Sequence, residues 1–144
     1  MAAEEPSAGA RLEAAAIAQG LVHDPAAATL VGAWARDTDR ACVVEGVGGV
    51  QRIGIVSDYG DGQDCSATGI VERKGERLRV TLGECRIDAT FDGERIVFPG
   101  EVPPACTSLC RGRASLAAFA VERQSESASE AATLRGRGGR RLCE

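Results

Sequence analysis

Residues 77–98 read RLRVTLGECRIDATFDGERIVF, and the alternation of apolar and polar side chains in this stretch decides the fold class. Within 77–82, Leu78, Val80 and Leu82 share one face, while arginine and threonine side chains occupy the other. Residues 85–91 repeat the pattern, with apolar side chains at every odd position. Strict alternation is typical of antiparallel strands that bury one face, so this stretch predicts a β-hairpin over a core.

The same period extends on both sides of this stretch. Glycine-containing turns at residues 48–49, 74–76 and 92–94 separate successive runs. We predict eight strands, at residues 30–35, 40–47, 50–57, 65–73, 77–82, 85–91, 95–98 and 115–123. An alanine-rich helix is expected at 11–19, ended by Gly20, and a serine-capped helix at 125–134.

The fold class is therefore mainly β, an eight-stranded antiparallel barrel or barrel-like sandwich with an N-terminal and a C-terminal helix. We expect a disordered lead and helix over residues 1–28. Residues 29–144 are expected to form a single disulfide-stapled β-barrel domain with a C-terminal helix and tail. A chain of 144 residues can bury a genuine core, but with 3% aromatics that core is built of small side chains.

Charge and composition restrict the partners. The formal net charge is −4, which argues against bulk attraction to nucleic acid or to anionic membranes. No apolar run is long enough to span a membrane. Sixteen arginines stand against a single lysine, and asparagine is absent, as is typical of proteins from GC-rich bacterial genomes. We expect a monomer.

Six cysteines point to an oxidising compartment, because reduced compartments rarely keep such sets without a metal. We expect three disulfides gathered at one end of the barrel, with Cys85 joined to Cys106 or Cys110. The protein is then periplasmic or secreted, with a secretory signal removed ahead of Met1. The alternative is zinc held by the C-x₃-C pair of residues 106 and 110. The full set is Cys42, Cys65, Cys85, Cys106, Cys110 and Cys143.

Other motifs carry weaker signals for chemistry. Residues 58–64 (DYGDGQD) hold three carboxylates that could suit calcium, but the EF-hand order is absent, so we interpret them as a polar hairpin tip. Residues 37–39 (DTD) are expected to be a solvated turn, and residues 46–49 (GVGG) a hairpin turn. The arginine-rich residues 135–141 are interpreted as a solvated tail. His23 is the only histidine, and neither an enzymatic activity, nor a bound metal, nor a cofactor is predicted.

The segment Gly32-Ala33-Trp34 lies on the first predicted strand, just after the helical lead. This Gly-x-Trp resembles the signature of lipocalins and related calycin barrels. The resemblance implies that Trp34 plugs one barrel end and that Arg123, on the last strand, packs across the indole. The size also resembles the small barrel lysozyme inhibitors of bacterial envelopes, although residues 66–69 (SATG) do not reproduce their serine-rich inhibitory loop.

Two functions follow as hypotheses. The first is a calycin-like module of the bacterial envelope that binds a small apolar ligand through Trp34, Val80, Leu82, Ile87, Phe91, Ile96, Phe98 and Arg123. The second is a protein-interaction or inhibitor module that contacts an envelope protein through rim loops at residues 58–64 and 99–113. An open cavity would favour the first hypothesis, and a filled core would favour the second.

Overall fold

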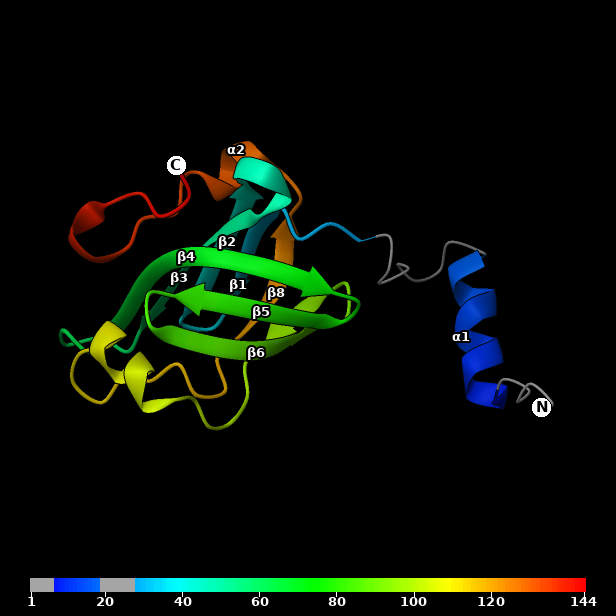
Figure 1. Cartoon of the computed structure of the whole chain (residues 1–144), viewed down its shortest axis with the longest axis horizontal. Coiled ribbons are helices and arrows are strands. Elements are labelled where there is room, and N and C mark those ends of the chain that lie inside the picture. The colour runs from blue at the N-terminus through cyan, green and yellow to red at the C-terminus, as the bar shows by residue number, and fades with distance from the viewer. Residues whose placement is uncertain (1–6, 19–27) are drawn as a thin grey trace.

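The computed structural model describes residues 7–18 and 28–144; the predicted helix stop at Gly20 and the single His23 lie outside these residues. Eight antiparallel strands form one closed barrel in sequence order (Figure 1). The strands are β1 (Gly32–Arg36), β2 (Asp39–Glu45), β3 (Gln51–Asp58), β4 (Asp64–Lys74), β5 (Arg77–Leu82), β6 (Cys85–Phe91), β7 (Arg95–Val97) and β8 (Ala120–Ser125).

The predicted fold class is confirmed, and the alternation that predicted it is visible in the burial of the strands. Along β5 and β6 every second residue is buried, and both strands have the predicted bounds. The residues 47–49 form a short 3₁₀ turn (η1, Val47–Gly49) between β2 and β3, as expected for a hairpin turn. Of residues 37–39, only 37 and 38 form an exposed turn, because Asp39 begins β2 and is half-buried.

The predicted strand 115–123 is wrong in its first half, because β8 begins only at Ala120. Residues 115–119 turn instead: Ala118 has a φ of +58°, and the Phe119 N–H donates to the Leu116 carbonyl at 3.1 Å. Leu116 and Phe119 are nevertheless buried. The apolar residues that suggested a strand therefore belong to a loop that fills one end of the barrel.

The helices are short and lie outside the barrel wall. α1 (Ala8–Ala18) replaces the predicted helix 11–19, and within the described residues no helix is long and apolar enough to cross a membrane. α2 (Ala128–Ala131) is shorter than the predicted 125–134, although the Ser127 side chain caps it by accepting the Glu130 N–H. The chain leaves α2 early because Leu142 donates its N–H to the Leu134 carbonyl, closing a loop.

The barrel closes where β1 pairs with β8, and Gly32 is the residue that permits this approach. Its φ is +139°, and a Cβ built there would lie 1.8 Å from the Ser125 carbonyl oxygen. A bulge follows between Ala33 and Trp34, after which Trp34 pairs with Arg123. Closure leaves no free sheet edge between β1 and β8, so every strand has two neighbours.

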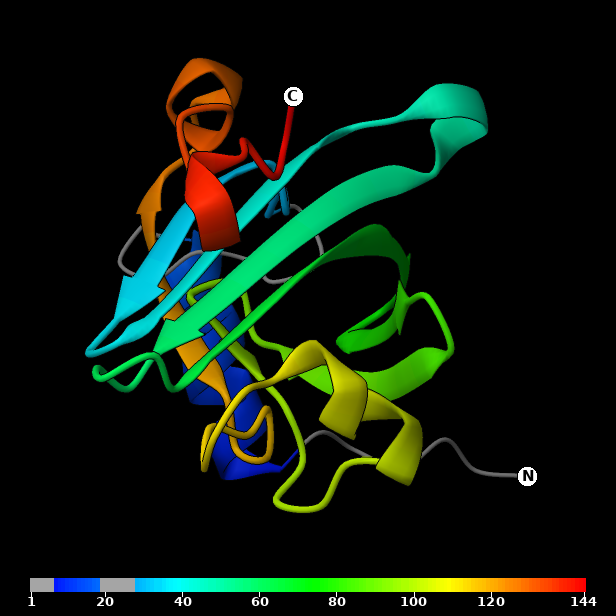
Figure 2. The same cartoon turned by 90° about the vertical axis from the view of Figure 1, so that its left-hand side faces the viewer.

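Two ends of the barrel must be distinguished. We call the end that carries the turns at residues 46–50, 75–76 and 92–94 the plug end. The opposite end carries the β3–β4 hairpin tip and the long connection between β7 and β8, residues 98–119, which we call the rim loop. This loop contains η2 (Pro104–Leu109) and lies against the β4 to β6 side of the barrel (Figure 2). We call this end the stapled end.

Candidate functional site

The barrel interior brings together the apolar residues predicted to bind a ligand. They pack in one continuous core, and each of them is at most 2% exposed. A void large enough for water would expose the side chains around it, so these side chains fill the space between them. Binding of an apolar ligand here stays a prediction. The residues are Trp34, Val80, Leu82, Ile87, Phe91, Ile96 and Phe98.

At the plug end, Trp34 and Arg123 form the contact that the lipocalin resemblance implies. The Arg123 guanidinium carbon lies 4.3 Å from the centre of the Trp34 ring, and the indole N–H donates to the Leu30 carbonyl at 3.0 Å. Arg123 also donates to the carbonyls of Thr29 and Val31. Burial lowers the pKa of Arg123 from its usual value, and the charges of Glu126 and Glu94 oppose this shift only in part.

A second arginine continues this stack across the barrel end. The Trp34 and Phe91 rings meet edge to face with centroids 5.9 Å apart. The Arg73 guanidinium lies 4.7 Å from the Phe91 centroid and donates to the Ala28 carbonyl. Four side chains therefore stack across the plug end and close it, in the order Arg123, Trp34, Phe91 and Arg73. We refer to these four residues as the plug.

At the stapled end, two disulfides hold η2 against the strand starts. Cys65 of β4 is joined to Cys110, and Cys85 of β6 is joined to Cys106, one of the two pairings predicted for Cys85. Cys65 and Cys85 begin alternate strands and therefore share one rim, as expected. The zinc alternative for residues 106 and 110 does not apply, because both sulfurs are in disulfides.

The third disulfide departs from the prediction that all six sulfurs share one end. Cys42 lies in the middle of β2, opposite Gly54 of β3, and its sulfur bonds to Cys143 on the outer wall. Cys42 points outward because its neighbours Ala41 and Val43 face the core. The prediction is therefore correct for four sulfurs and wrong for this pair.

The two rim segments named in the sequence, 58–64 and 99–113, are in direct contact. The Tyr59 hydroxyl donates to the Ser115 carbonyl at 3.1 Å, just beyond the second segment. The Arg113 N–H donates to the Gln63 side-chain oxygen at 2.9 Å, and the Arg111 N–H donates to the Asp64 carbonyl at 2.7 Å. The hairpin tip and the rim loop therefore form one surface.

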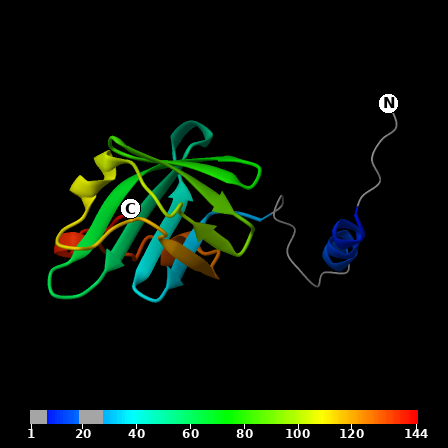
Figure 3. The same ribbon diagram turned by 90° about the horizontal axis from the view of Figure 1, so that it is seen from below.

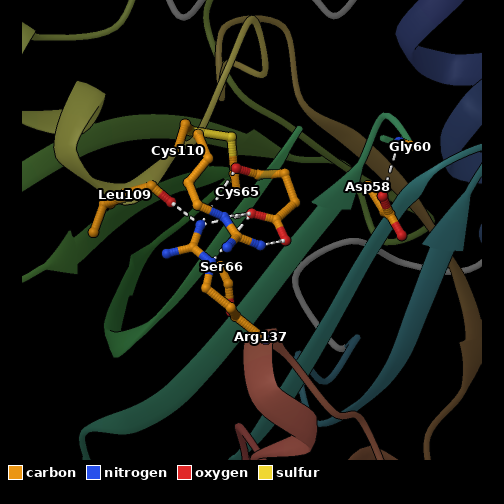
Figure 4. A network of polar contacts seen from close by, with 9 residues as sticks. Asp58, Gly60, Cys65, Ser66, Leu109, Cys110 and Arg137 are labelled. Carbon is orange, nitrogen blue, oxygen red and sulfur yellow. Dashed lines mark hydrogen bonds and ion pairs between the residues drawn. A yellow bond between two sulfur atoms is a disulfide. The ribbon is translucent and has the colours of Figure 1, made fainter. Parts of the chain in front are cut away.

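Asp64 is the centre of this surface, where Arg137 lies beside Ser66 and Leu109 (Figure 4). One of its carboxylate oxygens lies 2.8 Å from Nη2 of Arg111, and the other lies 2.7 Å from Nη2 of Arg137. The hydrogen bonds from Arg111, and then those from Arg137, lower the pKa of Asp64 to about 2. Arg137 also donates to the Leu109 carbonyl in η2 at 3.3 Å. The carboxylate thus joins the start of β4, the rim loop and the C-terminal segment.

The C-terminal segment is solvated at its arginines, as predicted, but it is a folded loop. Residues 134–142, which we call the tail loop, contain η3 (Arg137–Gly139) and close through the bridge between Arg135 and Arg141. Leu142 packs so closely over Gly54 that a Cβ there would lie 2.5 Å from the Leu142 Cβ. The tail loop lies on the same side of the barrel as η2 (Figure 3).

Two hollows lined by described residues lie on the outside of the barrel. The larger, of about 550 Å³, lies at the β4–β5 hairpin and is lined by Glu72, Arg73, Lys74, Arg77, Leu78, Arg79 and Asp88. The smaller, of about 340 Å³, lies between β4 and the tail loop and is lined by Ser66, Thr68, Arg137, Gly138, Arg140 and Leu142. In the first hollow, Arg79 and Asp88 form an ion pair in which Nε of Arg79 lies 2.6 Å from Oδ1 of Asp88. Only the second adjoins the Asp64 network.

Sequence reasoning did not identify the roles of Asp64, Arg111 and Arg137, because Asp64 is 47 and 73 positions away from its two partners. One signal was present. Residues 102–121 and 131–143 contain six arginines and not one aspartate or glutamate, in a chain of net charge −4. These two acid-free stretches are the segments that the structure brings together.

Comparison with known proteins finds no match among protein-family models, curated proteins or solved structures. The resemblance to lipocalins therefore depends on the Gly32-Ala33-Trp34 motif and on geometry, with no matching family or relative to support it. The closed eight-stranded antiparallel barrel is compatible with it, and so is the stacking of Arg123 on Trp34. The chain is a small closed β-barrel with three intramolecular disulfides.

Proposed function

We propose that this protein is an exported protein-interaction module of the bacterial envelope, periplasmic or secreted, that binds another protein through its stapled end. The packed interior supports this function over ligand carriage, because the residues that would line a cavity already fill it. Three disulfides support export, since such crosslinks persist in oxidising compartments.

The observation that carries the proposal is the way the rim loop is held. Two disulfides fix η2, and hydrogen bonds from Tyr59, Arg111 and Arg113 fix the adjoining hairpin tip. Ordering a free loop on binding costs about 1–2 kcal/mol per residue in backbone entropy. A loop that is already ordered avoids most of that cost, which is how rigid binding surfaces gain affinity. Most of η2, including Ala105, Thr107 and Ser108, is exposed and available for contact.

The test compares one bulky substitution at each end of the barrel. Ala105→Trp places a large side chain on exposed η2, and Val47→Trp places the same side chain on the exposed turn of the plug end. A protein captured from bacterial envelope extract by the oxidised wild type is identified, and its affinity is measured with all three proteins. We expect Ala105→Trp to weaken binding about tenfold or more and Val47→Trp to leave it unchanged.

Two results would overturn the proposal. Equal binding by the wild type and Ala105→Trp would show that the stapled end is not the interface. Native mass spectrometry that finds a stoichiometric apolar adduct in the barrel, lost in Ile87→Phe, would favour the ligand-carrier hypothesis. Each of the three variants must first show the full set of three disulfides by intact mass.

A further inference from the structure

Arginines of the rim loop and of the tail loop beside it give the stapled end and the adjoining outer wall a positive surface, on a chain that is acidic overall. They come from residues 102–121 and 131–143, the two acid-free stretches of the sequence. All six arginine residues are exposed. They are Arg111, Arg113, Arg135, Arg137, Arg140 and Arg141.

One carboxylate brings the two loops together without neutralising them. Asp64 accepts hydrogen bonds from the guanidinium groups of both Arg111 and Arg137, so it supplies one negative charge for two positive ones. Among the residues that the structure describes, Arg113, Arg140 and Arg141 make no ion pair with a carboxylate. The surface therefore retains a net positive charge.

The smaller hollow gives this surface a place for a specific contact. Its wall combines the Arg137 and Arg140 side chains with the hydroxyl-bearing Ser66 and Thr68 of β4. Ser66 accepts the Arg137 N–H at 3.1 Å, which fixes one wall of the hollow. Guanidinium and hydroxyl groups are the donors that carboxylates prefer, and arginine can bind a carboxylate through two parallel hydrogen bonds.

We propose that this surface binds an acidic segment of a partner protein, and that one of its aspartate or glutamate side chains enters the hollow beside Arg140. The inference rests on the proposed function and specifies the chemistry of its partner. A protein segment is favoured over a nucleic acid or a membrane, because Asp58 and Asp61 lie on the hairpin tip that joins the rim loop. A long run of phosphates would meet these carboxylates and the overall negative charge, whereas a short acidic segment would not.

The test uses a labelled octaglutamate peptide as the probe, with fluorescence anisotropy at low and at physiological ionic strength. The variant Arg140→Glu/Arg141→Glu reverses two exposed charges on the tail loop. The matched control, Arg77→Glu/Arg86→Glu, reverses two exposed charges on β5 and β6 and produces the same net charge. We expect the tail-loop variant to bind about tenfold more weakly or worse, the control to bind within about twofold of the wild type, and added salt to weaken all binding.

Three results would overturn the inference. These are failure of the wild type to bind octaglutamate at low salt, equal loss in both variants, and tighter binding of duplex DNA or phosphatidylglycerol vesicles than of the peptide. Failure here is distinguishable from failure of the proposed function. Suppose that Ala105→Trp releases a captured partner and that Arg140→Glu/Arg141→Glu still binds it. The stapled end would then remain the interface, and the proposal of an acidic segment would be wrong.

Discussion

The two ends of the barrel are closed by different means. The plug end is closed by side chains of the strands themselves, with two arginines stacked on two aromatic rings and bonded to the carbonyls of residues 28–31. The stapled end is closed by the rim loop, whose buried Phe98, Leu116 and Phe119 reach into the barrel. The loop has little regular structure to order it, and two disulfides hold it down.

This difference shows where covalent crosslinks are needed. A strand is ordered by hydrogen bonds to two neighbours, so a side-chain stack suffices to close the end that strands surround. A long irregular loop must lose backbone entropy without that compensation. Crosslinks reduce the entropy of its unfolded state, and they leave the outer face of the loop free for other contacts.

The largest expected effect tests the plug. Trp34→Ala removes the ring on which Arg123 stacks and should reduce the free energy of unfolding by about 4 kcal/mol, since Trp34 is fully buried. Urea unfolding followed by far-UV circular dichroism measures the loss. Trp34→Phe keeps an aromatic face and should lose less than half as much. Equal losses in the two variants would show that the indole N–H bond to the Leu30 carbonyl, which both variants lack, stabilises this end more than the aromatic stack does.

The next effect tests the staples. Replacing both Cys85 and Cys106 by alanine opens a disulfide that closes 21 positions of sequence, and should reduce the free energy of unfolding by about 3 kcal/mol. Limited proteolysis should then cut first within residues 98–119, while hydrogen exchange at β1 stays slow. Faster exchange at β1 as well would mean that the two ends unfold as one unit, contrary to the comparison drawn here.

The smallest effect tests the Asp64 network through pH. The pKa of this carboxyl is lowered from 3.8 to about 2 in the folded chain, so its stabilising contribution is complete above pH 4 and is lost as the pH falls towards 2. Asp64→Asn should therefore be less stable than the wild type at pH 6, and the two should converge near pH 2. Urea unfolding at several pH values measures this, with Asp61→Asn on the same hairpin as the control. If the difference in stability between the wild type and Asp64→Asn stays constant with pH, the charge of Asp64 does not stabilise this end.

Much of the barrel could be predicted because its signals are local. The alternation in β5 and β6 depends on residues that are neighbours in sequence, and both strands have the predicted bounds. The error at residues 115–119 arose because buried apolar residues in a loop resemble those in a strand. The positive φ at Ala118 makes this segment a turn instead of a strand. An alanine in the sequence gives no indication of a positive φ.

The candidate surface was harder to predict because its contacts join distant parts of the chain. The pairing of Cys85 was narrowed to two partners from strand order alone, and one of them is correct. The meeting of Arg111 and Arg137 at Asp64 depends on how the rim loop and the tail loop fold back, which no local pattern encodes. The absence of aspartate and glutamate from residues 102–121 and 131–143 was visible in the sequence, but only the fold shows that these two stretches lie together.

The Cys42–Cys143 disulfide has a mechanical consequence. It turns residues 42–143 into a covalent ring that contains β3 to β8 entire, since its ends are 101 positions apart. A pulling force applied to the two termini would peel β1 away and would then act on the sulfur–sulfur bond. The remaining strands would bear no load. A single cut by a protease anywhere inside the ring would likewise release no fragment, because both halves stay joined through the same bond.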